Sequence, residues 1–119
     1  MAAIVVIDDR QDILEIVQLV LQIDKHSVRI FTDGQAALDA LPLESCDLVF
    51  CDLNMPTMSG YTFVELLRLQ ERYQLLPIVA LTAAEDLNTE KILAAGFTSI
   101  LPKPFRADEL KRVVAKHLA

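Results

Sequence analysis

The sequence predicts an α/β fold in which one parallel sheet is covered by helices on both faces. Segments with strand character alternate five times with segments of helical periodicity along the 119 residues. The strand segments at residues 3–7 and 47–51 are almost continuously apolar, as expected of strands buried on both faces. Such alternation is typical of a doubly wound sheet. No internal repeat or linker interrupts it, and we therefore predict one domain over residues 1–119.

The first five elements are indicated by apolar periodicity and by the residues that end each segment. Apolar side chains recur at helical spacing between Arg10 and Ile23. A second, shorter helix at residues 35–41 is expected to stop at Pro42. The second strand, which ends at Phe31, is the weakest and suits the outer edge of the sheet. The predicted elements are a strand at residues 3–7, a helix at 10–23, a strand at 27–31, a helix at 35–41 and a strand at 47–51.

The last five elements are bounded by capping residues and by charges that suit helix ends. Ser59 is expected to cap the third helix, and Gly96 to close the fourth. The last helix has acids in its first turn and bases in its last turn, which complements its dipole. The predicted elements are a helix from Ser59 to about residue 72, a strand at 77–81, a helix at 85–95, a strand at 98–101 and a helix at 106–118.

Composition excludes several classes of partner and predicts a cytoplasmic protein. The formal net charge of −6 argues against binding to nucleic acid or to an anionic membrane surface, which both favour a basic face. No apolar run approaches the roughly 18 residues of a membrane span, and no basic segment of a signal peptide precedes the first strand. Cys46 and Cys51 would lie about 16 Å apart on an extended strand, too far for a disulfide, which predicts reduced thiols.

Polar side chains of reactive type follow four of the five predicted strands. They are Asp8 and Asp9 after the first strand, Asp52 after the third, Thr82 after the fourth and Lys103 after the fifth. Each has an ordinary alternative: the first two as helix N-caps, the threonine as a strand-end hydroxyl, and the lysine as a surface residue. The carboxyl ends of parallel strands lie at one edge, where ligands of such sheets bind. Their joint occurrence at strand ends therefore favours a shared site.

Three carboxylates at one edge predict a bound divalent cation. Two unit charges 4 Å apart repel by roughly 4 kcal/mol at an effective dielectric of 20. Because the donors are all oxygens, they select a hard ion, and Mg²⁺ commonly combines one or two carboxylates with waters and a phosphate. Lys103 and Thr82 would then contact phosphoryl oxygens, and Asp52 would be the nucleophile of a phosphoryl transfer.

Four short motifs occur at the predicted strand ends in a fixed order. They are Val-Val-Ile-Asp-Asp at residues 5–9, Asp-Leu-Asn-Met-Pro at 52–56 with Ser-Gly at 59–60, Leu-Thr-Ala-Ala at 81–84, and Gly96 before Lys-Pro-Phe at 103–105. In order and spacing they resemble the receiver domain of two-component response regulators, along essentially the whole chain. The resemblance implies the flavodoxin-like strand order 2-1-3-4-5, with five helices around a five-stranded parallel sheet.

The resemblance also implies a role for each strand-end residue. Asp52 would accept a phosphoryl group from a phosphohistidine on a histidine kinase or histidine phosphotransfer protein. Mg²⁺ would be bound directly by Asp9 and Asp52, through water by Asp8, and by the backbone carbonyl of Asn54. Such a protein catalyses its own phosphorylation and slow dephosphorylation but is not a turnover enzyme.

Within the same resemblance, Thr82 and Lys103 would hold phosphoryl oxygens, and the bond between Lys103 and Pro104 would be cis. An output protein or domain would bind the face formed by the fourth helix, fifth strand and fifth helix. Ile100 departs from the family, which usually has Tyr or Phe three positions before the lysine as a switching ring. Phe97 is an alternative source of that ring.

One alternative function stays open, and two others each lack a feature that they need. A receiver fold with an inactive switch would be a phosphorylation-independent interaction module, and Ile100 keeps this alternative open. A magnesium-dependent phosphatase with an aspartyl nucleophile would need a second carboxylate two residues after Asp52, where Asn54 stands instead. A flavodoxin would need a phosphate loop rich in Ser, Thr and Gly after the first strand, where the sequence has acids.

Overall fold

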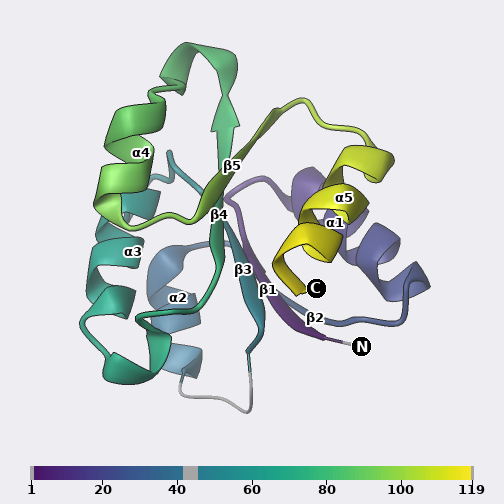
Figure 1. Cartoon of the computed structure of the whole chain (residues 1–119), viewed down its shortest axis with the longest axis horizontal. Coiled ribbons are helices and arrows are strands. Elements are labelled where there is room, and N and C mark those ends of the chain that lie inside the picture. The colour runs from purple at the N-terminus through teal and green to yellow at the C-terminus, as the bar shows by residue number, and fades with distance from the viewer. Residues whose placement is uncertain (1, 42–45, 119) are drawn as a thin grey trace.

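The computed structural model describes residues 2–41 and 46–118, which form a five-stranded parallel sheet in the order β2-β1-β3-β4-β5 (Figure 1). This order confirms the predicted flavodoxin-like fold. The strands are β1 (Ala3–Ile7), β2 (Ser27–Phe31), β3 (Leu48–Asp52), β4 (Ile78–Ala83) and β5 (Ser99–Lys103). The weak strand β2 lies at one outer edge, as predicted, and β1 and β3 are neighbours.

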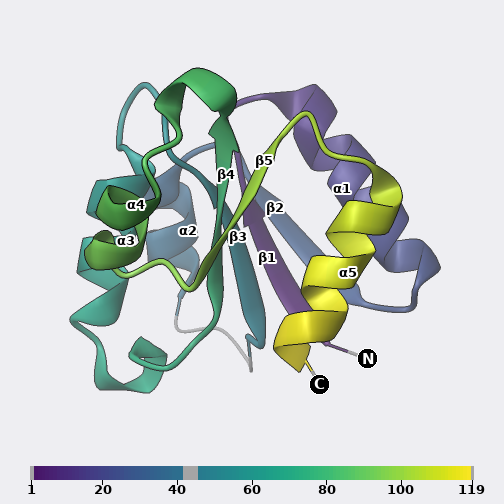
Figure 2. The same cartoon turned by 45° about the horizontal axis from the view of Figure 1, so that its top comes forward.

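Two layers of helices cover the sheet, one on each face (Figure 2). One layer consists of α1 (Gln11–Ile23) and α5 (Ala107–Leu118). The other consists of α2 (Gly34–Ala40), α3 (Gly60–Arg68) and α4 (Thr89–Ala95). Successive residues of each strand point to opposite faces, so the core divides into two apolar clusters. Within β3, for example, Phe50 faces the layer of α1 and α5, whereas Cys51 faces the other layer.

The prediction for the third helix is correct at its start and wrong at its end. Ser59 caps α3 by accepting a hydrogen bond from the backbone of Thr62. The helix ends at Arg68 rather than near residue 72, and a 3₁₀ turn, η1 (Glu71–Tyr73), follows. The chain turns there because Arg68 donates to the carbonyl of Tyr73, whose ring is buried beneath the turn. Periodicity cannot reveal a turn that is fixed by such a contact.

The prediction for the fourth helix is wrong at its start. Residues 84–86 form a 3₁₀ turn, η2 (Ala84–Asp86), and α4 begins only at Thr89. Leu87 and Asn88 are extended between the two, and the Asn88 side chain caps α4 by accepting from the backbone of Lys91. The end of α4 at Gly96 is confirmed: this glycine has φ = 120°, a conformation that glycine adopts without strain.

Strand β5 extends further than the predicted residues 98–101. It continues through Pro102 to Lys103, and these residues pair with Thr82 and Ala83 of β4. Proline is tolerated because β5 is an edge strand, whose outer side needs no backbone donor. The two extra residues place Lys103 level with the end of β4. The expected stop at Pro42 lies outside the described residues.

Both cysteines are free thiols, as predicted. Cys51 is fully buried in β3, and Cys46 is partly buried just before that strand. Burial raises the pKa of both thiols above the ordinary value. We therefore regard them as protonated core residues at neutral pH.

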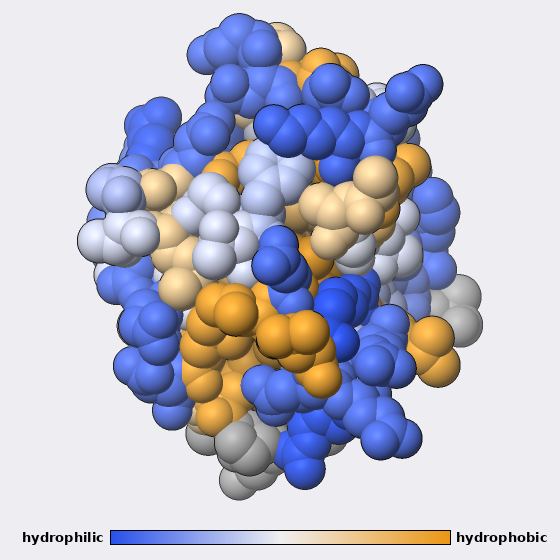
Figure 3. All heavy atoms as spheres, turned by 90° about the vertical axis from the view of Figure 1, so that its left-hand side faces the viewer, coloured by the Kyte–Doolittle hydropathy of each residue, from blue (hydrophilic) through white to orange (hydrophobic). Residues whose placement is uncertain are grey.

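The surface over α2, α3 and α4 is largely polar, with an apolar patch on it (Figure 3). Exposed leucines at the C-terminal end of α3 include Leu66 and Leu69. No helix among residues 2–41 and 46–118 has the length and apolar character needed to cross a membrane.

Candidate functional site

The strand-end residues selected from the sequence gather at one edge of the sheet. The carboxyl ends of β1, β3, β4 and β5 lie at the upper edge of the molecule in Figure 1. Carboxylate oxygens of Asp8, Asp9 and Asp52 all lie within 4.8 Å of one another. Asp8 is fully buried, and Asp52 and Thr82 are 7% and 1% exposed, whereas Asp9 is open to solvent. The sheet thus holds a carboxylate cluster with one open side.

Lys103 reaches this cluster from β5 across the sheet. Its Nζ lies 2.7 Å from Oδ2 of Asp8 and 3.4 Å from Oδ1 of Asp52. In the described part of the chain, it is the one basic side chain that forms an ion pair with these carboxylates. Lys103 therefore cannot be counted as an ordinary surface lysine, because its ammonium lies between two of the acids. The peptide bond between Lys103 and Pro104 is cis, as the resemblance implied.

The two acids after β1 do not cap the helix that follows. The N-cap position of α1 is Arg10, which makes no capping bond with its side chain. Asp8 instead accepts a hydrogen bond from the backbone of Arg10 at 3.0 Å through Oδ1, while its other oxygen accepts from Lys103. Both oxygens of the buried carboxylate are thereby satisfied, as burial of a charge requires.

The environment of Asp52 weakens its acidity. Burial and the neighbouring charge of Asp8 raise its pKa to about 6, and the attraction of Lys103 only partly opposes them. At neutral pH the group is still mainly ionised, so it can act as a nucleophile. The elevated pKa means that the folded protein disfavours the ionised form of Asp52, and a bound cation would offset this effect.

The donor set fits Mg²⁺. Three carboxylates face one ammonium, which leaves two negative charges uncompensated at the edge of the sheet. All the donors are hard oxygens, and the exposed Asp9 leaves the cluster open to water on one side. The expected ligand residue Asn54 is the second residue after β3, between the buried residues Leu53 and Met55.

Gly60 fixes the loop that follows Asp52. A Cβ atom at this position would overlap the carbonyl oxygen of Asp52 and lie 2.9 Å from Cα of Leu53. The backbone of Gly60 donates to the carbonyl of Leu53 at 2.8 Å. The start of α3 therefore packs directly on the backbone of the site. The sequence motif included Gly60, but periodicity gave no sign of this close approach.

Thr82 is placed at the site, but its hydroxyl points elsewhere. Oγ1 donates to the carbonyl of Ala83, the next residue, at 3.1 Å. The hydroxyl would have to leave this carbonyl in order to donate to a phosphoryl oxygen beside Asp52.

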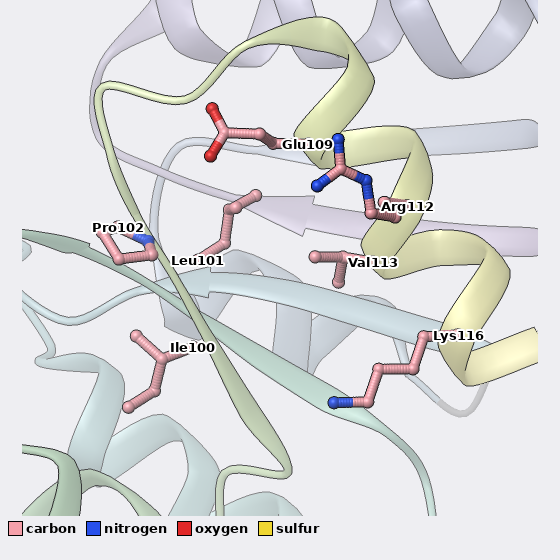
Figure 4. A pocket seen from close by; sticks show the side chains of 7 residues that line it. All are labelled: Ile100, Leu101, Pro102, Glu109, Arg112, Val113 and Lys116. Atoms are coloured by element: carbon pink, nitrogen blue, oxygen red, sulfur yellow. The ribbon is translucent and has the colours of Figure 1, made fainter.

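Ile100 lies on β5, at the position where the resemblance leads one to expect a ring. It is partly buried against the cluster that α2, α3 and α4 cover. Beside it, a pocket of about 320 Å³ lies between β5 and α5 (Figure 4). Its lining comprises Ile100, Leu101, Pro102, Glu109, Arg112, Val113 and Lys116.

Phe97 does not take the place of the missing ring. It is 4% exposed and meets the ring of Tyr61 on α3 edge to face, with 6.1 Å between the centroids. The aromatic pair lies in the layer between α3 and α4 rather than at the outer face of β5. In this conformation Phe97 packs between α3 and α4, and a switching role for its ring stays a prediction.

Sequence reasoning missed two sets of polar contacts, one beside the site and one at the opposite end of α3. Asp86 accepts a hydrogen bond from the side chain of Asn54 at 2.6 Å. Arg68 donates to the carbonyls of Gly96 and Leu76, as well as to that of Tyr73. Asp86 and Gly96 lie 32 and 28 residues from their partners in the sequence, and no local pattern marks these two contacts.

Known proteins share both the sequence motifs and the fold of this chain. Residues 4–115 match the model of the response regulator receiver domain. Response regulator ArlR of Staphylococcus haemolyticus is 33% identical over 112 residues, which cover 92% of this chain and 49% of ArlR. The chain thus spans about half the length of this curated relative.

Two solved structures show the same arrangement. The chemotaxis response regulator CheY4 of Vibrio cholerae has a TM-score of 0.89 and 33% identity, with 98% of each chain covered. The receiver domain of sensor histidine kinase PA1611 from Pseudomonas aeruginosa has a TM-score of 0.89 and 26% identity, with 98% of this chain and 97% of that chain covered. That structure contains a magnesium ion coordinated in its active site cleft.

Proposed function

This chain belongs to the response regulator receiver family, and from that premise we propose that Asp52 accepts a phosphoryl group from a phosphohistidine. The donor would be a histidine kinase or a histidine phosphotransfer protein. The observation that carries the proposal is the placement of a buried carboxylate 3.4 Å from the Lys103 ammonium, at the open edge of the sheet. A signalling role follows from the family, whose receiver domains are signalling domains rather than turnover enzymes.

The proposed reaction is a single displacement at phosphorus. A carboxylate oxygen of Asp52 attacks the phosphorus atom while the bond from phosphorus to the histidine nitrogen breaks. The imidazole leaves with the bonding electron pair and takes up a proton, and an acyl phosphate remains on Asp52. The ammonium of Lys103 and the hydroxyl of Thr82 offset the charge on the phosphoryl oxygens.

The acids at the edge of the sheet would hold Mg²⁺ for this reaction. Asp9 and Asp52 would be direct ligands, Asp8 would act through water, and the carbonyl of Asn54 would complete the protein donors. When bound, the ion would neutralise charge shared between the carboxylates and the phosphoryl group. The unbalanced charge of the cluster supports this requirement.

We expect slow hydrolysis of the acyl phosphate but no turnover of external substrates. A phosphatase of this type needs an acid or base two residues beyond its nucleophile, and Asn54 can serve as neither. The two protonated cysteines suit the cytoplasmic location that we propose for such a signalling protein.

We further propose that phosphorylation is transmitted to a partner through the face formed by α4, β5 and α5. Movement of the Thr82 hydroxyl toward the phosphate would bias a pre-existing equilibrium of this face. Ile100 cannot rotate as an aromatic ring would, because its β-branched side chain has a restricted χ1. The conformational change that the partner recognises would therefore come mainly from the backbone of β4 and α4.

The test is phosphorylation by acetyl phosphate, with and without Mg²⁺, followed by intact-protein mass spectrometry. The wild type should gain one phosphoryl group only with Mg²⁺, and Asp52→Asn should gain none. Asp39→Asn is the matched control, because Asp39 is an exposed helical carboxylate that bonds only Gln35 among the described residues. Unchanged labelling of Asp52→Asn would overturn the proposal. No labelling of a folded wild type would instead favour a phosphorylation-independent interaction module.

A further inference from the structure

The connection from β4 to α4 is the least buried part of the described chain near the site. Every residue from Ala84 to Lys91 is exposed, and the next buried side chain is Ile92. This segment begins two residues after Thr82 and lies at the top of the molecule, between β4 and α4 (Figure 1). Because apolar burial does not hold it in place, its position depends on a few side-chain contacts.

One of these contacts joins the segment to the loop after Asp52. The amide nitrogen of Asn54 donates to Oδ2 of Asp86 at 2.6 Å. A hydrogen bond to an ionised acceptor is short and stronger than one between neutral groups. The bond thus connects the two loops that carry the proposed phosphoacceptor and the threonine.

Asn54 is the fixed end of this bond. It lies between two buried residues, Leu53 and Met55. The backbone of Leu53 donates to Leu81 at 3.2 Å and accepts from Gly60 at 2.8 Å. The loop after β3 is therefore held firmly on both sides, and Asp86 is the group that is positioned by the contact.

A second contact joins the β4–α4 segment to α3. The ammonium of Lys91 lies 4.8 Å from the centre of the Tyr61 ring, which joins the first turn of α4 to α3. Burial and the Asp86 charge both raise the pKa of Tyr61, which reflects the proximity of that carboxylate to the phenol. Asp86 thus bonds Asn54 and lies close enough to Tyr61 to affect its phenol.

We infer that Asp86 is a positioning residue whose bond to Asn54 holds the β4–α4 segment over the rim of the site and prolongs the lifetime of the phosphoryl group on Asp52. This inference rests on the proposed function. Hydrolysis requires a water whose oxygen attacks phosphorus as the bond to the Asp52 oxygen breaks. Inorganic phosphate leaves, the proton of the water passes to the phosphate or to solvent, and the carboxylate is regenerated.

Asp86 opposes this reaction in two ways. It keeps the exposed segment close to the loop after β3, which narrows the approach of water from solvent. It also occupies the amide of Asn54, which otherwise could donate to and orient an incoming water. Both effects act in the same direction, so loss of the carboxylate should accelerate hydrolysis.

The test uses the full chain phosphorylated by acetyl phosphate with Mg²⁺, freed of donor and followed over time by mass spectrometry. In Asp86→Ala the half-life of the phosphorylated form should fall about fivefold. Asp86→Asn, which retains an acceptor oxygen, should restore part of the loss. Glu85→Ala is the matched control, since Glu85 is an exposed acid on the same turn, and its half-life should equal that of the wild type.

A second measurement does not depend on phosphorylation. In proton–nitrogen NMR spectra of the unmodified protein, the side-chain amide of Asn54 should shift in Asp86→Ala and exchange faster with water. Normal labelling with an unchanged half-life in Asp86→Ala would overturn the inference and leave the proposed function intact. Absence of labelling in the wild type would instead overturn the proposed function, and the inference with it.

Discussion

The acidic edge of the sheet and the β4–α4 segment lie side by side but are built in opposite ways. At the edge, Asp8, Asp52 and Thr82 are nearly or fully buried, and each is attached to the end of a strand. In the neighbouring segment, all residues from 84 to 91 are exposed. The contrast separates two requirements: reacting groups need fixed positions, whereas an element that transmits a signal must be able to move at small energetic cost.

Helix α4 shows the same contrast between its two ends. At its C-terminal end, the guanidinium of Arg68 donates to the carbonyl of Gly96 from Nη2 at 2.7 Å. At its N-terminal side, the exposed bond between Asn54 and Asp86 is the main polar link to the site. A displacement of α4 would therefore be largest near Thr89 and smallest near Gly96.

The largest effect on stability is expected for Gly60→Ala, in the rigid region beside Asp52. The added Cβ would overlap the backbone carbonyl of Asp52, which cannot move without disturbing β3. We expect the free energy of unfolding to fall by roughly 4 kcal/mol in urea denaturation. Gly34→Ala is the control, because its Cβ would meet side chains rather than backbone, Met58 at 3.0 Å and Phe63 at 3.3 Å, and a clearly smaller loss is expected. Equal losses in both variants would contradict the close approach.

Asp52→Asn should stabilise the protein in the absence of Mg²⁺. The folded-state pKa of about 6 lies above the ordinary value of 3.8. The protonated form therefore favours folding, and this contribution to stability is complete below about pH 4 and lost as the pH rises through about 6. At pH 7.5 the variant should be more stable than the wild type by roughly 3 kcal/mol.

Urea denaturation across the range from about pH 4 to about pH 7.5 measures the effect. The loss of stability that Asp52 causes as the pH rises should be absent in the variant. Added Mg²⁺ should raise the stability of the wild type more than that of the variant. A variant that is less stable than the wild type at pH 7.5 would show that the edge is not under electrostatic strain.

Arg68→Met should weaken the fixed end of α4. The substitution keeps most of the aliphatic stem but removes donors to the carbonyls of Tyr73, Leu76 and Gly96. We expect a loss of roughly 2 kcal/mol, together with faster amide hydrogen exchange in α4. Arg72→Met is the control, because the Arg72 guanidinium lies over the Tyr73 ring, 5.9 Å from its centre. Its removal should change the free energy of unfolding little. Unchanged exchange in α4 would contradict the proposed anchor.

The smallest effect is expected at the start of α4. Asn88→Ala removes the side-chain oxygen that accepts from the backbone of Lys91 at 3.1 Å. The loss should be roughly 1 kcal/mol, as for other N-caps. Because the segment is exposed, hydrogen exchange should increase in the first turn of α4 while Gly96 stays protected. An equal increase at both ends would show that α4 has no fixed end.

The positions of the reactive side chains could be predicted because they depend on a local pattern and a general rule. An apolar strand that stops at Asp8 or Asp52 places the acid at a strand end, and parallel strands collect their ends at one edge. The caps at Ser59 and Gly96 were predictable for a similar reason, since each satisfies the backbone of its own helix.

The errors occur where contacts outside the element itself determine where it begins or ends. The end of α3 depends on Arg68 and the carbonyls beyond it, and β5 extends to Lys103 because β4 pairs with it there. The helix predicted at residues 85–95 ran through the β4–α4 connection, where the structure has a 3₁₀ turn followed by a shorter helix.

By itself, the sequence determined the fold class, the strand order through the family motifs, and the residues that meet at the acidic edge. Only the tertiary structure showed that Lys103 lies between Asp8 and Asp52, and that Asn54 bonds Asp86. The reason is physical: apolar strand patterns and helix caps involve residues close together in the sequence, whereas these contacts join groups 32 or more residues apart. Their partners become neighbours only when the sheet has assembled.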